Sequence, residues 1–274
     1  MKRPLFILHP AKQFLILFFL AACQLAPSPT PTPPPTLAPH FTATLPAPTV
    51  APSPAPPTET STPEATPEGT PAAAATPDPN LGVGEVLYED KFDGASRWNW
   101  LRESEAVIFA VGGGQLNAVM MQGNVGSRFT AREDLKIGDQ QLRVTTRANL
   151  CYPRDEYGVM FRLIVDSLKN YYGYIFKLNC EGQARVELLQ NVQTTPLVDW
   201  TASPVIVPGA PAENTLMVWM AKDQFHFYVN DKYVFSLTDK TYAEGFYAFY
   251  IRDRTNGGES VSFDDLVVRE VKLP

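Results

Sequence analysis

The chain has few of the residues that build most catalytic and metal sites. Its 274 residues include three histidines and three cysteines, and only His226 falls in the part that we expect to fold. There is no His-Glu-x-x-His, no Cys-x-x-Cys and no glycine-rich loop that opens a helix. Gly112-Gly113-Gly114 lies between two expected strands and is interpreted as a turn. These absences exclude the common zinc and phosphate-binding motifs.

Positive charge is scarce too. The formal net charge is -6 at pH 7 and the isoelectric point is near 5.2. No basic stripe with interleaved aromatic residues occurs, so we expect no nucleic acid as a partner. Between Lys12 and Lys91 there is no lysine or arginine at all, which leaves the basic residues of the amino terminus on the side of a membrane that stays inside.

Long apolar runs are also missing. The run at 14–22 follows Lys2, Arg3 and Lys12 and is much shorter than the roughly 20 residues of a spanning helix, which is typical of a signal peptide. It ends in Leu20-Ala21-Ala22-Cys23, which resembles the lipobox of bacterial lipoproteins. The resemblance implies that 1–22 is removed and that a lipid on Cys23 anchors the chain to the outer face of the membrane. The alternative is an ordinary secretory signal cut after Ala22.

Proline is abundant, but in one segment. Residues 24–80 hold 18 of the 26 prolines, among Thr, Ala and Ser. Such a segment buries too little apolar surface to fold, so we expect 23–80 to be a disordered linker. At about 3.1 Å per residue where it is extended, it reaches on the order of 150 Å. Its composition indicates a spacer, and Thr and Ser beside Pro permit O-glycosylation.

After Asn80 the sequence alternates between apolar and polar residues in short runs. This pattern predicts an all-β domain over 81–274, a two-sheet antiparallel jelly-roll sandwich. Asn230-Asp231 and Gly182 predict tight hairpin turns, because these residues tolerate positive φ. The expected strands lie near 85–92, 105–111, 115–121, 140–150, 158–165, 171–179, 183–190, 215–221, 224–229, 232–237, 245–251 and 260–271.

Alternation also predicts the interior of the sandwich, because every second side chain of a strand shares one face. The expected core positions are Val159, Phe161, Leu163, Tyr174, Phe176, Leu178, Leu216, Val218, Met220, Phe225, Phe227, Val229, Tyr247, Phe249 and Ile251.

Several segments resemble a known group of folds. They are Tyr88-Glu89-Asp90-Lys91-Phe92-Asp93 with Trp98 and Trp100, then 157–162, 171–176, 214–216, 228–231, 244–246 and Ser262-Phe263-Asp264-Asp265-Leu266-Val267-Val268. Together they resemble the concanavalin A-like lectin/glucanase and laminin G-like jelly rolls. The match is at the level of the fold, and such folds host lectins, glycosidases, adhesion modules and spacers.

Two cysteines remain once Cys23 is assigned to the lipid. Cys151 and Cys180 each end an expected strand. If 158–165 runs antiparallel between those strands, both thiols emerge at the same end of one sheet, which favours a disulfide in an exported protein. Two free thiols are the alternative.

Catalytic carboxylates are not evident. The Glu-x-Asp-x-x-Glu strand of the retaining glucanases, which sets two carboxylates about 5 Å apart, is absent from the sequence. The nearest patterns, Glu103-x-Glu105 and Asp155-Glu156, are interpreted as solvated surface charge. The ending Phe-Asp-Asp-Leu also resembles the family of 3-keto-disaccharide hydrolases, so a hydrolase of that kind is the alternative function.

The resemblance also suggests a metal. No cofactor is required, but jelly rolls of this group often bind a structural calcium ion between the first and the last strand. Glu89, Asp90 and Asp264 stand at comparable places and offer the oxygen ligands that calcium prefers. In the other interpretation, Asp264 and Asp265 simply cap the end of a strand.

The positions opposite the expected core indicate a binding surface. Aromatic faces rimmed by polar groups bind sugars, and exposed apolar patches tend to be functional. We therefore expect glycan or cell-wall polysaccharide binding without catalysis; a structural or adhesive module that binds protein is a second alternative. The linker or a covering loop such as 191–213 could also bury these side chains. The expected site comprises Trp219, His226, Tyr228, Phe246, Tyr250, Arg162 and Lys177, with Asn179, Arg185 and Glu187 also pointing outward.

Overall fold

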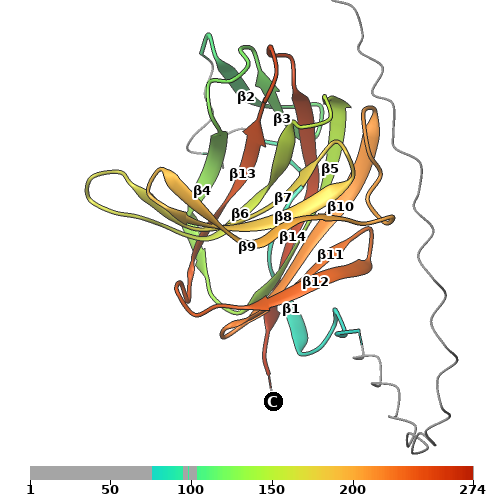
Figure 1. The fold of residues 1–274 in the computed structure, drawn as a ribbon. Helices are drawn as coiled ribbons and strands as arrows, with labels where there is room; N and C mark the ends of the chain where they lie inside the picture. The colour runs from blue at the N-terminus through green and yellow to red at the C-terminus, as the bar shows by residue number, and fades with distance from the viewer. Residues whose placement is uncertain (1–75, 95–97, 99–103, 274) are drawn as a thin grey trace, which may run out of the picture. The chain divides into compact units, whose positions relative to one another are not determined.

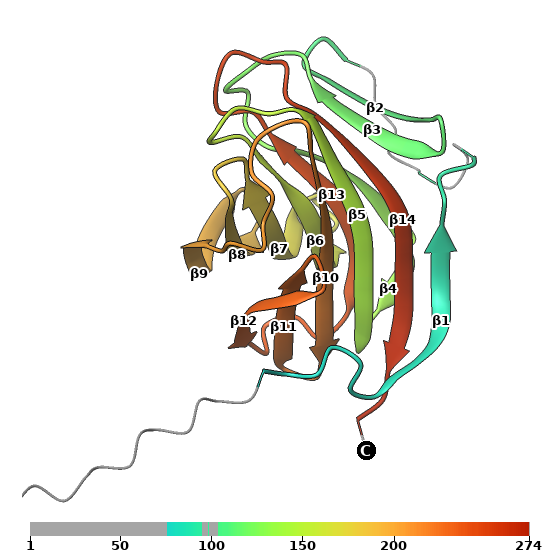
Figure 2. The same ribbon diagram turned by 90° about the vertical axis from the view of Figure 1, so that its right-hand side faces the viewer.

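The computed structural model describes residues 76–94, 98 and 104–273. All its regular elements are β-strands, fourteen in number, arranged in two antiparallel sheets (Figure 1). Figure 2 shows the sheets as two layers, with β7, β8 and β9 on one side and β5, β10 and β14 on the other. The expected all-β sandwich is therefore confirmed. The described part of the chain contains no helix that could cross a membrane.

The larger sheet has eight strands in the order β12-β11-β10-β5-β14-β3-β2, and β1 pairs with β14 beside that path. The bounds of its strands are β1 Val83–Asp90, β2 Val107–Gly112, β3 Gln115–Met120, β5 Gln140–Leu150, β10 Ala212–Ala221, β11 Gln224–Val229, β12 Lys232–Thr238 and β14 Ser260–Val271.

The smaller sheet has six strands in the order β4-β13-β6-β7-β8-β9. The bounds of its strands are β4 Arg128–Ile137, β6 Glu156–Val165, β7 Tyr171–Asn179, β8 Gln183–Gln190, β9 Gln193–Ala202 and β13 Gly245–Arg252.

The main core lies between the sheets and contains every expected core residue except Leu163. Leu163 packs instead in a second cluster on the outer face of the six-stranded sheet. The cause is a bulge in β6, where the pairing with β7 shifts between Phe161 and Ile164 and Arg162 has a φ of 47°. A bulge exchanges the two faces of a strand beyond it.

Arg162 is buried by the same bulge. The sequence predicts it on the outer face, but its guanidinium donates to the carbonyls of Lys222 and Tyr242 at 2.7 and 3.0 Å and is fully buried. It also pairs with Asp139 at 3.2 Å. The prediction that Arg162 is exposed for ligand binding is therefore wrong. Its guanidinium lies inside the protein and joins the loops that contain Lys222, Tyr242 and Asp139.

Two strands were not expected from the sequence. Strand β4 carries five charged residues in ten, which hides its alternation. Strand β9 contains Pro196 and was expected to lie in a covering loop, yet it forms the edge of its sheet. Proline is tolerated on an edge strand, where its missing N–H costs no ladder hydrogen bond.

The predicted turns are confirmed. Asn230 and Asp231 join β11 to β12 with φ values of 51° and 61°, as a tight hairpin of the primed type requires. Gly182 joins β7 to β8 with a φ of 84°, and Gly113 and Gly114 join β2 to β3.

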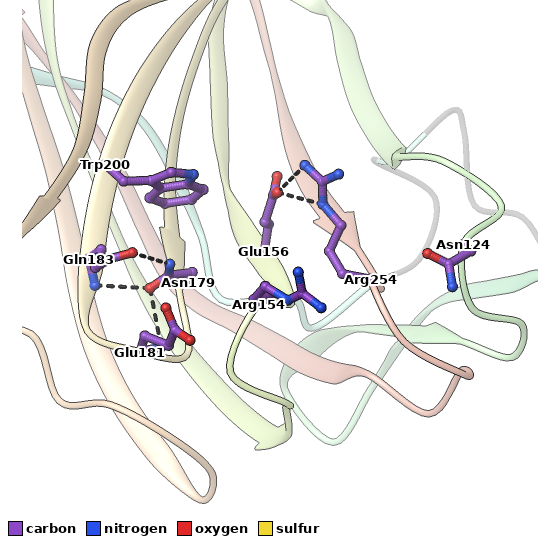
Figure 3. A pocket seen from close by; sticks show the side chains of 8 residues that line it. All are labelled: Asn124, Arg154, Glu156, Asn179, Glu181, Gln183, Trp200 and Arg254. Atoms are coloured by element: carbon purple, nitrogen blue, oxygen red, sulfur yellow. Dashed lines mark hydrogen bonds and ion pairs between the residues drawn. The ribbon is translucent and has the colours of Figure 1, made fainter. Parts of the chain in front are cut away.

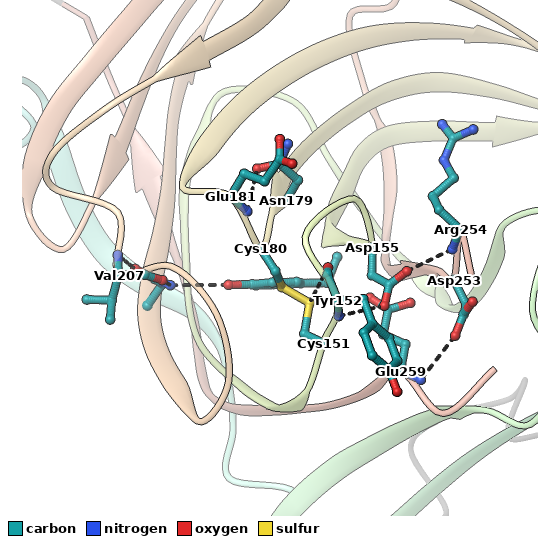
Figure 4. Close-up of a disulfide and its surroundings, with 12 residues drawn as sticks. Cys151, Tyr152, Asp155, Asn179, Cys180, Glu181, Val207, Asp253, Arg254 and Glu259 are labelled. Carbon is teal, nitrogen blue, oxygen red and sulfur yellow. Dashed lines mark hydrogen bonds between the residues drawn. A yellow bond between two sulfur atoms is a disulfide. The ribbon is translucent and has the colours of Figure 1, made fainter. Parts of the chain in front are cut away.

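The predicted disulfide between Cys151 and Cys180 is present (Figure 4). The expected arrangement of strands around it is wrong, because β5 does not lie in the same sheet as β6 and β7. Cys151 follows β5 in the eight-stranded sheet, whereas Cys180 follows β7 in the six-stranded sheet. The disulfide therefore ties the two layers together at one end of the sandwich.

Candidate functional site

A polar pocket opens at one end of the six-stranded sheet. Its volume is about 410 Å³, within the range of small-molecule sites. Figure 3 shows Trp200 on one side of the pocket and Glu156 with Arg254 on the other. The side chains come from β6, β7, β8, β9 and the adjoining loops. The lining residues are Asn124, Arg154, Glu156, Asn179, Glu181, Gln183, Trp200 and Arg254.

Trp200 is the aromatic member of this pocket. It lies on the edge strand β9 and is half-buried. Lys177 Nζ lies 5.5 Å from the centre of its ring and the Arg185 guanidinium lies 5.6 Å from it. Two cations within about 6 Å of an indole hold the ring by cation–π attraction. The ring therefore has a defined place while part of it still faces the pocket.

Glu156 forms the opposite wall through a network of ion pairs. It accepts hydrogen bonds from Arg254 Nε at 2.7 Å, from Lys177 Nζ at 2.7 Å and from the Tyr250 hydroxyl at 3.1 Å. Lys177 also pairs with Glu187 at 2.9 Å. Both Glu156 and Lys177 are buried, so the pairs are poorly screened and their geometry is fixed.

The network controls the charge of Glu156. Burial by itself would raise the pKa of this carboxyl, but the charges and hydrogen bonds of Lys177 and Arg254 outweigh burial and lower it. Burial and the Glu156 charge raise the pKa of the Tyr250 hydroxyl, which stays a donor. Glu156 is therefore ionised, and it holds the Arg254 guanidinium in place at the wall of the pocket.

Amide side chains complete the pocket below Trp200. Asn179 donates from Nδ2 to Gln183 Oε1 at 2.7 Å, and its Oδ1 accepts from the backbone N–H groups of Glu181 and Gln183. Figure 3 shows these three side chains grouped on the side of Trp200. A ring face beside fixed amides, carboxylates and guanidinium groups can stack on a flat apolar surface and exchange several hydrogen bonds with its edges.

The predicted site residues of the six-stranded sheet lie on its outer face, and two of them, Lys177 and Tyr250, lie next to this pocket. Lys177 and Tyr250 bond to Glu156 from below, as described above. Phe246 packs in the outer apolar cluster with Tyr250. All three side chains are almost fully buried, so the prediction that they are exposed is wrong. Lys177 and Tyr250 support the pocket, whereas Phe246 lies at the other end of β13, opposite Leu163.

The predicted residues of the eight-stranded sheet are far less accessible than expected. The segment Pro77–Leu81 lies over them: Trp219 donates from Nε1 to the Leu81 carbonyl at 2.9 Å, and the Tyr228 hydroxyl donates to the Pro77 carbonyl at 3.0 Å. Trp219 is fully buried and stacks on His226 at 4.7 Å. The residues point outward from their sheet as expected, but Trp219 and Tyr228 are covered, and only His226 is half-exposed, with its Nδ1 2.7 Å from the Ser236 hydroxyl. They also lie on a different sheet from Lys177 and Tyr250.

The predicted calcium ligands are engaged in other contacts. Asp90 is buried and accepts hydrogen bonds from the Phe92 N–H at 2.8 Å and Trp98 Nε1 at 3.0 Å. Glu89 pairs with Lys91, and Asp264 accepts from the N–H of Asp265. Within the described ranges, no group of three or more His, Cys, Asp or Glu side chains is placed to hold a metal ion. Calcium binding stays a prediction.

Asp155-Glu156, interpreted from the sequence as surface charge, is buried. Asp155 accepts hydrogen bonds from the N–H groups of Tyr152 and Arg254, both at 2.8 Å (Figure 4). Burial raises the pKa of Asp155, with a contribution from Asp253. Glu259 is buried nearby and neither of its carboxylate oxygens has a hydrogen-bond partner. The correction follows from the fold, because the turn before β6 packs against the loop between β13 and β14 that carries Arg254. Glu103 and Cys23 lie outside the described residues.

Trp200 is the residue that sequence reasoning missed. Its alternation was hidden because Pro196 precedes it and the segment was expected to be a loop. A tryptophan between the polar residues Asp199 and Thr201 was the available signal.

Comparison with known proteins gives a fold. No family model matches the chain, and no curated protein matches it. A protein of unknown function with a galectin-like fold from Bacillus subtilis is similar at 13% identity with a TM-score of 0.53, over 70% of this chain and 99% of that one.

Two further structures are less similar. A carbohydrate-binding module from Bacillus subtilis has 15% identity and a TM-score of 0.49, over 64% of this chain and 96% of that one. The catalytic domain of an endo-1,3-beta-glucanase (laminarinase) from Thermotoga petrophila has 10% identity and a TM-score of 0.49, over 69% and 98%. At such identities a likeness shows fold alone. The similarity to the galectin-like protein, with its TM-score of 0.53, shows that the described domain has a galectin-like β-sandwich fold.

Proposed function

We propose that the domain binds a glycan, without catalysis, in the pocket between Trp200 and the Glu156–Arg254 pair. The observation that carries the proposal is a half-buried indole held by two cations and facing a wall of fixed polar groups. A pyranose ring has apolar C–H faces and a polar rim, so it matches an aromatic face beside convergent hydrogen-bonding groups.

The charge of Glu156 favours binding over hydrolysis. A glycosidase needs a carboxylic acid whose pKa is raised so that it can protonate the leaving group. The pKa of Glu156 is lowered, and its oxygens are already bonded to Arg254, Lys177 and Tyr250. The other carboxylate lining the pocket among the described residues is Glu181, which is exposed. The exposed Glu181 carboxylate and the Arg254 guanidinium that Glu156 holds in place suit recognition of hydroxyl groups.

A glycan array tests the proposal. Wild-type protein is expected to bind at least one glycan, and Trp200→Ala is expected to weaken binding at least tenfold, or about 1.4 kcal/mol. Tyr152→Ala is the matched control, because Tyr152 is an exposed aromatic that does not line the pocket. This control should bind like the wild type.

Three results would overturn the proposal. They are the absence of any bound glycan, binding that survives Trp200→Ala, and a Tyr152→Ala variant that loses as much affinity as Trp200→Ala. Turnover of sugar glycosides by the wild type would instead support the hydrolase alternative and remove the claim that the site is non-catalytic.

We also propose that the domain is displayed on the outer face of a membrane through a diacylated Cys23. The support is the lipobox-like Leu20-Ala21-Ala22-Cys23 and the proline-rich spacer that follows it. Mass spectrometry of the protein from a bacterial membrane fraction should find an amino terminus at Cys23 with a lipid adduct. An uncleaved or unacylated terminus would contradict this proposal and leave glycan binding untouched.

A further inference from the structure

The outer face of the six-stranded sheet carries a second pocket beside the polar one. Its volume is about 370 Å³, and we call it the apolar pocket because Met160, Ile175 and Leu189 line it, together with polar residues. The turns between β6 and β7 and between β8 and β9 form its rim. The lining residues are Ser127, Phe129, Met160, Lys169, Asn170, Tyr171, Ile175, Leu189, Asn191, Val192, Thr194, Tyr250 and Arg252.

The two pockets are consecutive along the same strands. On β7, Lys177 supports the polar pocket and Ile175, two residues away, lines the apolar one; on β8, Glu187 and Leu189 have the same relation. Side chains two apart on a strand share a face and lie about 7 Å from each other. The polar and apolar pockets are therefore neighbours on one face.

Tyr250 connects them directly. Its ring lines the apolar pocket, and its hydroxyl donates to Glu156, which lines the polar pocket, at 3.1 Å. Lys177 Nζ lies 5.4 Å from the Tyr250 ring and 5.5 Å from the Trp200 ring. The supporting network under the first pocket thus extends to the wall of the second.

The composition of the second pocket fits one common sugar substituent. Met160, Ile175 and Leu189 offer contact for a small apolar group, whereas a bare hydroxyl there would lose its hydrogen bonds to water. The rim adds Asn170, Asn191 and Thr194, whose amide and hydroxyl groups can pair with an amide. An acetamido group presents a methyl and an amide together, but a deoxy sugar presents only the methyl.

We infer that the ligand is an oligosaccharide that contains N-acetylhexosamine, with one sugar against Trp200 and the acetamido group of a neighbouring sugar in the apolar pocket. This inference rests on the proposed function and adds the substrate class. It requires a ligand of at least two sugar units, because the two pockets have separate linings.

Calorimetric titration of the protein with two β-1,4-linked tetrasaccharides tests the inference. Chitotetraose carries an acetamido group on each ring, and cellotetraose has a hydroxyl in its place. Chitotetraose is expected to bind at least tenfold more tightly. Thr194→Trp, which fills the apolar pocket from β9, should reduce this preference to less than threefold while cellotetraose binding is kept.

Thr195→Trp is the matched control, because Thr195 is the exposed next residue on β9 and does not line the pocket. It should keep the wild-type preference, and Trp200→Ala should weaken the binding of both sugars. Equal affinity of the wild type for the two sugars, or a preference that survives Thr194→Trp, would overturn the inference and leave glycan binding intact. Failure to bind any glycan on the array would overturn both.

Discussion

The outer faces of the two sheets carry similar residues and differ in what covers them. Each has an outward tryptophan with a cation or imidazole beside it: Trp200 on the six-stranded sheet and Trp219 on the eight-stranded sheet. Trp219 is fully buried under the segment 77–81, whereas Trp200 borders an open pocket. Alternation along a strand thus identifies the face of a side chain, and only tertiary structure decides whether that face is a surface.

The largest expected effect is on the covered face. Trp219→Ala should lower the free energy of unfolding by about 3 to 5 kcal/mol, because it empties a fully buried site and removes the bond to the Leu81 carbonyl. Urea unfolding measures the loss. The folded fraction should keep its glycan affinity. A loss of affinity without a loss of stability would instead place the glycan-binding face on the eight-stranded sheet.

The second largest effect on stability is expected from the disulfide that links the two sheets. Reduction of the Cys151–Cys180 disulfide should lower the free energy of unfolding by about 3 to 4 kcal/mol, because the unfolded chain regains the conformational freedom of a loop closed across 29 residues. Urea midpoints with and without reductant measure it, and a Cys151→Ala, Cys180→Ala double variant should show no response to reductant. An unchanged midpoint in the wild type would contradict a stabilising role.

The buried acids beside that link should make stability depend on pH. Burial, with Asp155 and Asp253 nearby, raises the pKa of Glu259 well above its ordinary value of 4.5. The folded state therefore holds the proton of the Glu259 carboxyl more tightly than the unfolded state. The stability that this proton contributes is complete below about pH 4.5 and is lost as pH rises through the folded-state pKa.

Glu259→Gln should consequently stabilise the protein by about 1 to 3 kcal/mol at pH 8 and flatten the decline of stability towards high pH. Thermal unfolding from pH 5 to pH 9 measures both effects. Glu85→Gln, at an exposed position on β1, is the control and should change neither. A destabilised Glu259→Gln at pH 8 would show that the carboxylate has a charged partner.

The smallest effect concerns the segment that covers Trp219. Tyr228→Phe removes the hydrogen bond to the Pro77 carbonyl and should lower the free energy of unfolding by about 1 kcal/mol. Amide hydrogen exchange should rise in 78–83 and stay unchanged around Trp200. Equal increases on both faces would mean that the two faces are not independent.

The sequence was sufficient for the fold because alternation is strong in the buried strands. It predicted twelve of the strands and nearly the whole core, and it placed the hairpin at Asn230-Asp231. It failed where the pattern is interrupted, at the bulge around Arg162 and in β4. No local pattern predicts this bulge, because it consists of a positive φ at Arg162 and a shift in the pairing of β6 with β7.

The candidate site was less predictable. Lys177 and Tyr250 were identified from the sequence as outward residues, and both lie beneath the pocket. Trp200 was missed because Pro196 disguised an edge strand, and Glu156 was misjudged because its burial depends on Lys177 and Arg254, which are distant in sequence. A site made by four strands and the loops beside them exists only once the strands are paired.

Nuclear magnetic resonance of the tryptophan indole groups tests the account most directly. Chitotetraose is titrated into ¹⁵N-labelled protein, and the indole signals are assigned by their loss in Trp200→Phe and Trp219→Phe. The Trp200 signal is expected to shift with saturation, and the Trp219 signal is expected to stay in place. A saturating shift of Trp219 with an unmoved Trp200 would contradict the account.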